Sequence, residues 1–224
     1  AAAGVVLADE DIIASALVGP KSFADLVGPS FYLDGLAQST SISHHRFIVE
    51  RWFLVAEAVY RSGYDLYHYS FNGLTLKDVV DVDFHYVFSH GEHPVVGHSS
   101  YGLRLSFHRT LALAYERYKD PRYILLWQTD GIRNLLNTAE NRRIMFYLPT
   151  LMSAPRVGDL LQAMSFGSIA RGGRHISGST LLVDSGFTFL RGKASDGTQL
   201  EALMLFKPHG TVNSHQSYDN LTLQ

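Results

Sequence analysis

The chain has 224 residues, 46% of them hydrophobic and 12% aromatic, so it can bury a core, which excludes a disordered tail or tether. Its 19 Lys and Arg against 21 Asp and Glu give a net charge of -2, which excludes nonspecific binding along a nucleic-acid backbone. The absence of Cys excludes disulfides, Cys-ligated metals and thiol nucleophiles, so any catalysis depends on His, Tyr, Arg, Lys and carboxylates.

The first two thirds of the chain have helical periodicity. Apolar residues spaced +4, +3, +4 from Ile48 to Val59 predict an amphipathic helix between Ser41 and Gly63. Similar spacing predicts further helices over residues 76–87, 103–118, 123–137 and 157–164. Charged residues interrupt every long apolar run, so we expect no transmembrane helix.

The composition changes after residue 166, where Gly residues separate short runs rich in Val, Thr, Phe and Leu. The runs over residues 180–184, 187–191, 200–206 and 221–224 predict antiparallel strands joined by turns. We therefore expect two domains, a helical one over residues 1–166 and an antiparallel β-sheet domain that begins at residue 167. The last run reaches residue 224 without a turn, which predicts that the chain is part of a longer protein.

The 11 His and 12 Tyr residues indicate proton-transfer chemistry. Most of the histidines fall into three groups: His44 and His45; His85, His90, His93 and His98; His209 and His215. The first pair opens the first strong helix, where adjacent side chains diverge, so at most one of the two joins a given site. The run from His90 to His98 could supply metal ligands, but its Gly and Pro residues favour a solvated loop.

Three further segments carry candidate site residues. Tyr101 is expected at the start of the third helix, either as a functional phenol or as a buried core aromatic. Arg171 and Arg174, beside His175, offer guanidinium forks suited to a carboxylate or sulfate, with mere solubility as the alternative. A polar loop over residues 207–221 lies between two predicted strands, where sites are commonly built.

Several of these segments carry the motifs of one enzyme family. Residues 184–191 read D-S-G-F-T-F-L-R, which is similar to a strand-pair motif D-x-G-[FY]-x-x-L-R. The loop that follows, with Pro208-His209-Gly210, His215 and Asp219, is similar to P-H-G…H-x-x-x-D-x-L. Together with the segments around Asp65 and Tyr101, these motifs resemble the heparinase II/III-like superfamily of polysaccharide lyases, which includes the toroid-type alginate lyases.

The resemblance implies an α+β multidomain fold, an (α/α) toroid that is incomplete here, followed by an antiparallel β-sandwich. It also implies β-elimination at a uronic acid of an acidic polysaccharide, with alginate favoured, by a secreted or periplasmic enzyme. Tyr101 would protonate the leaving oxygen, His215 or the Tyr101 phenolate would remove the α-proton, and His45 would belong to the same catalytic group. The residues expected to bind the substrate are His44, Arg171, Arg174, His175 and Tyr218.

The chain also departs from the family pattern at two positions. His44 stands where the family often has an Asn that neutralises the substrate carboxylate, and Ser217 stands where some members have a metal-binding His. The reaction requires no cofactor, and Ser217 argues against a structural divalent metal. Two alternatives stay open, a uronosyl epimerase on the same scaffold and a non-catalytic carbohydrate-binding fragment. The expected partner is an acidic polysaccharide or oligosaccharide, bound in a positive cleft, with neither nucleic acid nor membrane.

Overall fold

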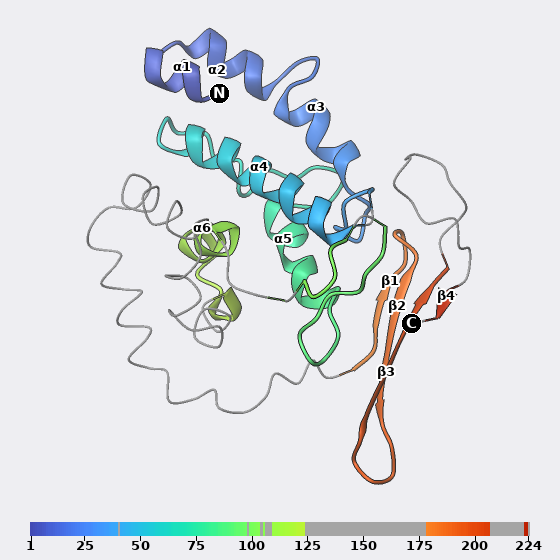
Figure 1. Ribbon diagram of the computed structural model, residues 1–224. Coiled ribbons are helices and arrows are strands. Elements are labelled where there is room, and N and C mark those ends of the chain that lie inside the picture. The colour runs from blue at the N-terminus through green and yellow to red at the C-terminus, as the bar shows by residue number, and fades with distance from the viewer. Residues whose placement is uncertain are drawn as a thin grey trace, which may run out of the picture. The chain divides into compact units, whose positions relative to one another are not determined.

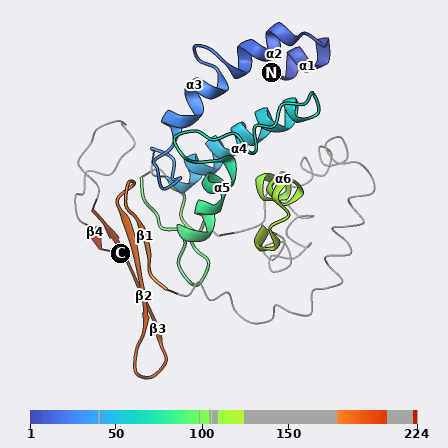
Figure 2. The same ribbon diagram turned by 180° about the vertical axis from the view of Figure 1, so that it is seen from behind.

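The structure, a computed structural model, describes residues 1–39, 41–97, 99–103, 105, 109–123, 178–206 and 222–223 (Figures 1 and 2). The chain divides into two compact units, and each is described by itself. One combines Ala1–Leu105 with His175–Gln224, and the other is Ser106–Arg174. The predicted domain boundary at residue 167 lies outside the described residues.

Three short helices begin the chain: α1 (Ala2–Leu7), α2 (Glu10–Leu17) and α3 (Phe23–Val27), which a 3-10 turn, η1 (Gly28–Ser30), extends. Their hydrophobic runs are too short for periodicity to predict them one by one. The capping residues are a clearer signal, because the Asp9 carboxylate accepts from the Ile12 N–H and the Ser22 hydroxyl accepts from the Asp25 N–H. Each side chain satisfies a backbone donor that the first helical turn leaves without a partner.

The helices predicted between Ser41 and Gly63 and over residues 76–87 are confirmed. Helix α4 (Ile42–Tyr60) begins at the Ser41 cap and buries a face that includes Val49 and Phe53. Helix α5 (Leu76–His85) begins with a capping box between Thr75 and Asp78. It ends two residues before the predicted end at residue 87, because the backbone of Tyr86 leaves the helical region at φ -94 and ψ 57.

Helix α6 (Arg109–Tyr118) belongs to the second unit and begins later than predicted. The expected helix over residues 103–118 is wrong at its start, because the backbone there is hydrogen-bonded to another segment. The Leu103 carbonyl accepts from the His93 N–H, and the Leu105 N–H donates to the Gly91 carbonyl, each at 2.8 Å. The predicted helices over 123–137 and 157–164 lie outside the described residues, apart from Tyr123.

The four predicted strand segments form one antiparallel sheet. Its strands are β1 (Thr180–Leu182), β2 (Phe187–Lys193), β3 (Gln199–Leu205) and β4 (Thr222–Leu223), hydrogen-bonded in that order. In the register of the central pair, Phe189 lies opposite Leu203 and Arg191 lies opposite Glu201. Since side chains alternate between the two faces of a strand, all four of these residues share one face.

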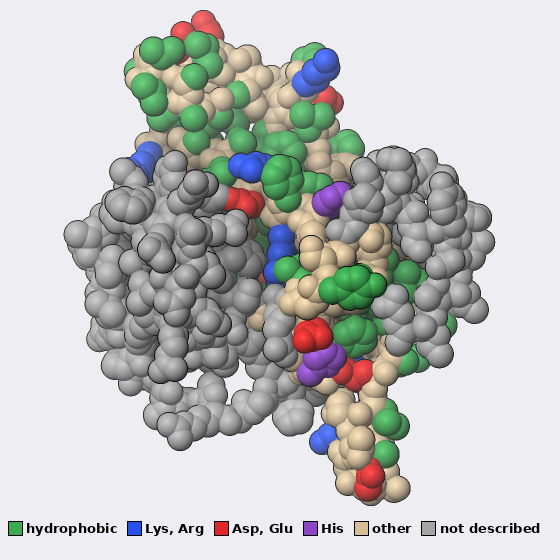
Figure 3. Space-filling model, viewed as in Figure 1, with side chains coloured by type: hydrophobic (Ala, Val, Ile, Leu, Met, Phe, Trp, Pro, Cys, Tyr) green, Lys and Arg blue, Asp and Glu red, His purple; other side chains and the backbone are tan. Residues whose placement is uncertain are grey.

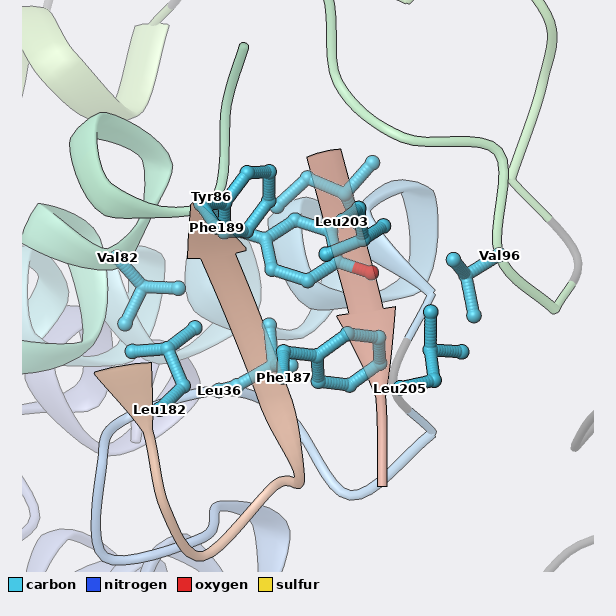
Figure 4. Packing of buried hydrophobic residues seen from close by; sticks show 10 residues of the cluster. Leu36, Val82, Tyr86, Val96, Leu182, Phe187, Phe189, Leu203 and Leu205 are labelled. Atoms are coloured by element: carbon cyan, nitrogen blue, oxygen red, sulfur yellow. The ribbon is translucent and has the colours of Figure 1, made fainter. Parts of the chain in front are cut away.

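That face of the sheet packs on the helical segment and forms the core of the first unit (Figure 4). The Tyr86 ring lies edge-on to two rings of β2, with centroids 5.0 Å from Phe187 and 5.5 Å from Phe189. The cluster consists of Leu36, Ile42, Val82, Tyr86, Val96, Leu182, Phe187, Phe189, Leu203 and Leu205. Helices and sheet in this unit therefore depend on one common core, while the toroid and the β-sandwich stay predictions.

Candidate functional site

The loop that carries Tyr101 is fastened to the N-terminus of α4. The Ser99 hydroxyl lies 3.2 Å from the Ser41 hydroxyl and accepts from the Ile42 N–H at 3.1 Å. The Ser100 N–H donates to the Ser43 hydroxyl at 3.3 Å. Because the first backbone N–H groups of a helix lack partners within it, Ser99 acts as an additional cap for α4. Two segments that are far apart in the sequence are thereby joined at the helix end that carries His44 and His45.

Tyr101 itself points into solvent, with 89% of its surface exposed. The alternative that it packs in the core is therefore wrong. It lies in a turn with Gly102, before the first residues of α6, and the neighbouring serines fix the backbone that leads to it. An exposed phenol on an anchored loop can meet a ligand without any rearrangement of the core.

His45 is held in the interior by the backbone. The side chain is 1% exposed, its Nδ1 accepts from the Ala37 N–H at 3.1 Å, and its Nε2 lies 2.9 Å from the Val79 carbonyl. Since Nδ1 is an acceptor, Nε2 carries the proton and donates to Val79, which fixes the neutral tautomer. The geometry thus favours a structural role for His45, joining α4 to α5, over proton exchange with a substrate.

His44 is the member of the pair that is accessible. It is half-buried, and its position on α4 is rotated by about 100° from that of His45. Its backbone N–H donates to the Ser41 hydroxyl, so the turn that carries it is fixed by the cap. Of the two histidines predicted here, His44 is therefore the one that can contact a ligand beside Tyr101.

A polar network lies beneath this helix end. The Arg46 Nε is 3.0 Å from the Asp83 carboxylate, and the Arg46 Nη2 donates to His93 Nε2 at 2.8 Å. His93 in turn donates from Nδ1 to the Tyr86 carbonyl. Burial lowers the pKa of His93 to about 4, against the opposing effect of the Asp83 carboxylate and with a smaller lowering contribution from Arg46. His93 is therefore neutral near pH 7 and links α4, α5 and the following loop.

The predicted solvated loop at residues 90–98 is only partly correct. The side chain of His90 is 56% exposed and lies 3.5 Å from Glu92, as expected for a solvated group. His93 is 3% exposed instead, because backbone and guanidinium partners compensate the burial of its ring. Across the described ranges, no three His, Asp or Glu side chains converge where they could hold a metal ion.

A second buried ion pair, here named the Arg191 clasp, joins the sheet to the segment that precedes the Tyr101 loop. The Arg191 Nε donates to Glu201 at 2.9 Å, and its Nη2 donates to the Val87 carbonyl. Both Glu201 carboxylate oxygens accept from the Ser89 N–H at 2.8 Å, and one of them also accepts from the Ser89 hydroxyl. The sequence motif contains Arg191, but the motif alone does not show that the residue fastens this loop.

The Asp-x-Gly part of the same motif is fastened as well. One oxygen of the Asp34 carboxylate accepts from both the backbone N–H and the hydroxyl of Ser185, at 2.7 Å each. The other oxygen accepts from the Leu36 N–H at 3.2 Å. The turn between β1 and β2 is therefore tied to the loop that precedes α4.

The remaining candidates lie outside the described residues, and their arrangement around Tyr101 stays a prediction. They are His98, Arg171, Arg174, His175, His209, His215, Ser217 and Tyr218. In the described part of the chain, no helix is both long and apolar enough to cross a membrane. Comparison of the chain with protein-family models, with curated proteins and with solved structures finds no match. The resemblance to polysaccharide lyases therefore rests on the motif residues alone.

Proposed function

We propose that the chain is a polysaccharide lyase that cleaves a uronic-acid-containing acidic polysaccharide, with alginate the first candidate, by β-elimination. One observation carries the proposal. The exposed phenol of Tyr101 sits on a loop that Ser99 and Ser100 bind to the N-terminus of α4, the helix end that presents His44. These are the two segments in which the lyase motifs require an acid and a group for the substrate carboxylate.

The proposed reaction removes the proton on the carbon α to the carboxylate and expels the glycosidic oxygen at C4. The electron pair of the broken C–H bond forms the new double bond, and the C4–O pair leaves with the oxygen, which takes a proton from Tyr101. His215 or the Tyr101 phenolate accepts the α-proton. Negative charge develops on the carboxylate, so cationic and hydrogen-bonding groups there lower the barrier. His44 and Arg174 are the groups proposed for this task.

The buried His45 has a different role in the proposed reaction. Its two backbone hydrogen bonds, to Ala37 and Val79, hold the first turn of α4 against α5. His45 is therefore proposed as a positioning residue for His44 and the Tyr101 loop, and it does not contact the substrate. This assigns the solvent-facing chemistry to Tyr101 and His44.

The proposal is tested by incubating the full chain with alginate, heparin, chondroitin and hyaluronan. Formation of the unsaturated uronate raises the absorbance near the ultraviolet limit. Tyr101→Phe is expected to abolish the rise, whereas Tyr69→Phe, at another partly exposed tyrosine, is the matched control that retains it. No rise with any of the four polymers contradicts the proposal. Solvent deuterium in an uncleaved polymer would identify an epimerase, and binding without either reaction would identify a carbohydrate-binding fragment.

A further inference from the structure

Beyond the residues of the proposed reaction, α4 has an accessible face with an unusual combination of side chains. In Figure 3, His, hydrophobic and basic side chains follow one another along this helix. The α4 stripe is defined here as His44, Phe47 and Arg51, which are spaced +3 and +4 and so share one helix face. It extends about 10 Å along the helix axis from the end where the Tyr101 loop is fastened.

Phe47 and Arg51 form the part of the stripe that lies farther from the Tyr101 loop. Phe47 is 56% exposed, and the guanidinium carbon of Arg51 lies 4.5 Å from the centroid of its ring. A single exposed aromatic residue is ordinary on a protein surface. A guanidinium stacked on the ring is different, because stacking fixes its plane while its N–H groups stay available at the edge.

The guanidinium of Arg51 is not paired with an acidic side chain in the part of the chain that the structure describes. Within the described ranges, no carboxylate lies within ion-pair distance of Arg51, and its stacking on Phe47 is its one specific contact. The neighbouring Arg46 behaves differently, since it is committed to the buried Asp83. Helix α4 thus presents one basic side chain inward, paired, and another outward on an aromatic platform.

We infer that the α4 stripe is a substrate subsite that binds a uronate residue of an acidic oligosaccharide. The apolar face of a sugar ring packs on Phe47, and the carboxylate receives the forked hydrogen bonds of Arg51. His44 and the anchored Tyr101 loop lie at the end of the stripe, so a chain bound along it leads toward the proposed reaction centre. The inference rests on the proposed function for its substrate class, and charge complementarity selects an acidic saccharide as the occupant.

The test measures binding apart from turnover. The full chain carrying Tyr101→Phe is titrated calorimetrically with hexamannuronate, and with cellohexaose as an uncharged probe. Arg51→Met is expected to raise the Kd for hexamannuronate about tenfold, because a charge-assisted hydrogen bond is lost. Phe47→Ala is expected to raise it severalfold. The effect of Arg51→Met should shrink at high salt, whereas that of Phe47→Ala should not.

Two control variants remove side chains of similar type and exposure outside the stripe. Arg61→Met removes an exposed basic side chain at the other end of α4, and Leu33→Ala removes an apolar side chain of similar exposure. Both should leave the Kd for hexamannuronate unchanged. The stripe variants should also melt at the temperature of the parent chain.

The outcomes separate this inference from the lyase proposal. Lyase activity on alginate with an unchanged Kd in both stripe variants overturns the subsite and leaves the lyase standing. If Kd changes as expected but the chain that retains Tyr101 cleaves none of the four polymers, the subsite is supported and the lyase proposal is overturned. A melting temperature lowered by several degrees with an unchanged Kd shows that the stripe packs within the protein, which overturns the subsite. Loss of a dimer in Phe47→Ala, with an unchanged Kd, assigns the stripe to a second copy and overturns it too.

Discussion

Arg191→Met should be one of the most destabilising single substitutions in the first unit, because it opens the Arg191 clasp. The Arg191 side chain is 1% exposed and that of Glu201 is 11% exposed, so the pair lies in the interior. The guanidinium also donates to the Thr180 hydroxyl at 2.8 Å and to the Gly178 carbonyl at 3.0 Å. Met can still pack against the Phe189 ring, whose centroid lies 5.0 Å from the Arg191 guanidinium carbon, but it leaves the Glu201 charge without its cation.

Removal of one partner from a buried ion pair typically costs about 3–5 kcal/mol. Glu201 retains its hydrogen bonds from Ser89, so the lower end of this range, about 3 kcal/mol, is expected. For a unit of this size that corresponds to a melting temperature lowered by about 6–12 °C. Adding Glu201→Gln should recover part of the loss, because the double variant no longer buries an uncompensated charge.

The assay is urea unfolding followed by tryptophan fluorescence in a Trp127→Phe background. The chain has two Trp residues, so Trp52 on α4 then reports on the first unit. Lys193→Met, at an exposed position of the same strand, is the matched control and should change the free energy of unfolding by less than about 0.5 kcal/mol. A loss below about 1 kcal/mol for Arg191→Met, or no recovery in the double variant, would refute the reasoning.

Three further predictions concern the same unit. The folded protein holds His93 neutral down to about pH 4, whereas the unfolded chain protonates it below its ordinary pKa of 6.5; stability should therefore fall by about 3 kcal/mol as the pH drops through this window. Urea unfolding at pH 7, 6, 5 and 4 should show a shallower fall in His93→Gln, and equal slopes would contradict this. Ser99→Ala should cost about 1 kcal/mol by calorimetry, with faster amide exchange in the Tyr101 loop; unchanged exchange would argue against the anchor. Phe187→Ala should cost about 3–5 kcal/mol, with helix and sheet signals lost together; separate transitions would deny the common core.

The elements with long, regular patterns could be predicted from the sequence. Helix α4 has both a Ser cap and a sustained apolar spacing, and β2 and β3 are apolar runs bounded by Gly. Helix α3 has five residues, which is barely more than one turn, so only its Ser22 cap marks it. The true start of α6 was not predictable, because the hydrogen bonds of Leu103 with His93 and of Leu105 with Gly91 override local propensity.

The site was harder to predict because its polar partners are mostly backbone groups. Hydrogen bonds to the backbone of Ala37, Val79 and Tyr86 compensate the burial of His45 and His93. The sequence carries no signal for such carbonyl and amide partners. A solvated site and a satisfied interior histidine therefore look the same in the sequence. The Arg191–Glu201 pair is different, since the register of a simple hairpin places these two residues opposite one another.

The common core of the first unit also determines when the protein can fold during synthesis. Its apolar members lie between residues 36 and 96 and again between 182 and 205, so the ribosome makes the whole second unit between the two halves. Until β3 emerges, Ile42, Val82 and Tyr86 lack the sheet that covers them. We therefore expect the nascent helical half to expose an apolar surface and to bind chaperones that recognise apolar segments. We also expect the first unit to complete its folding slowly after release from the ribosome.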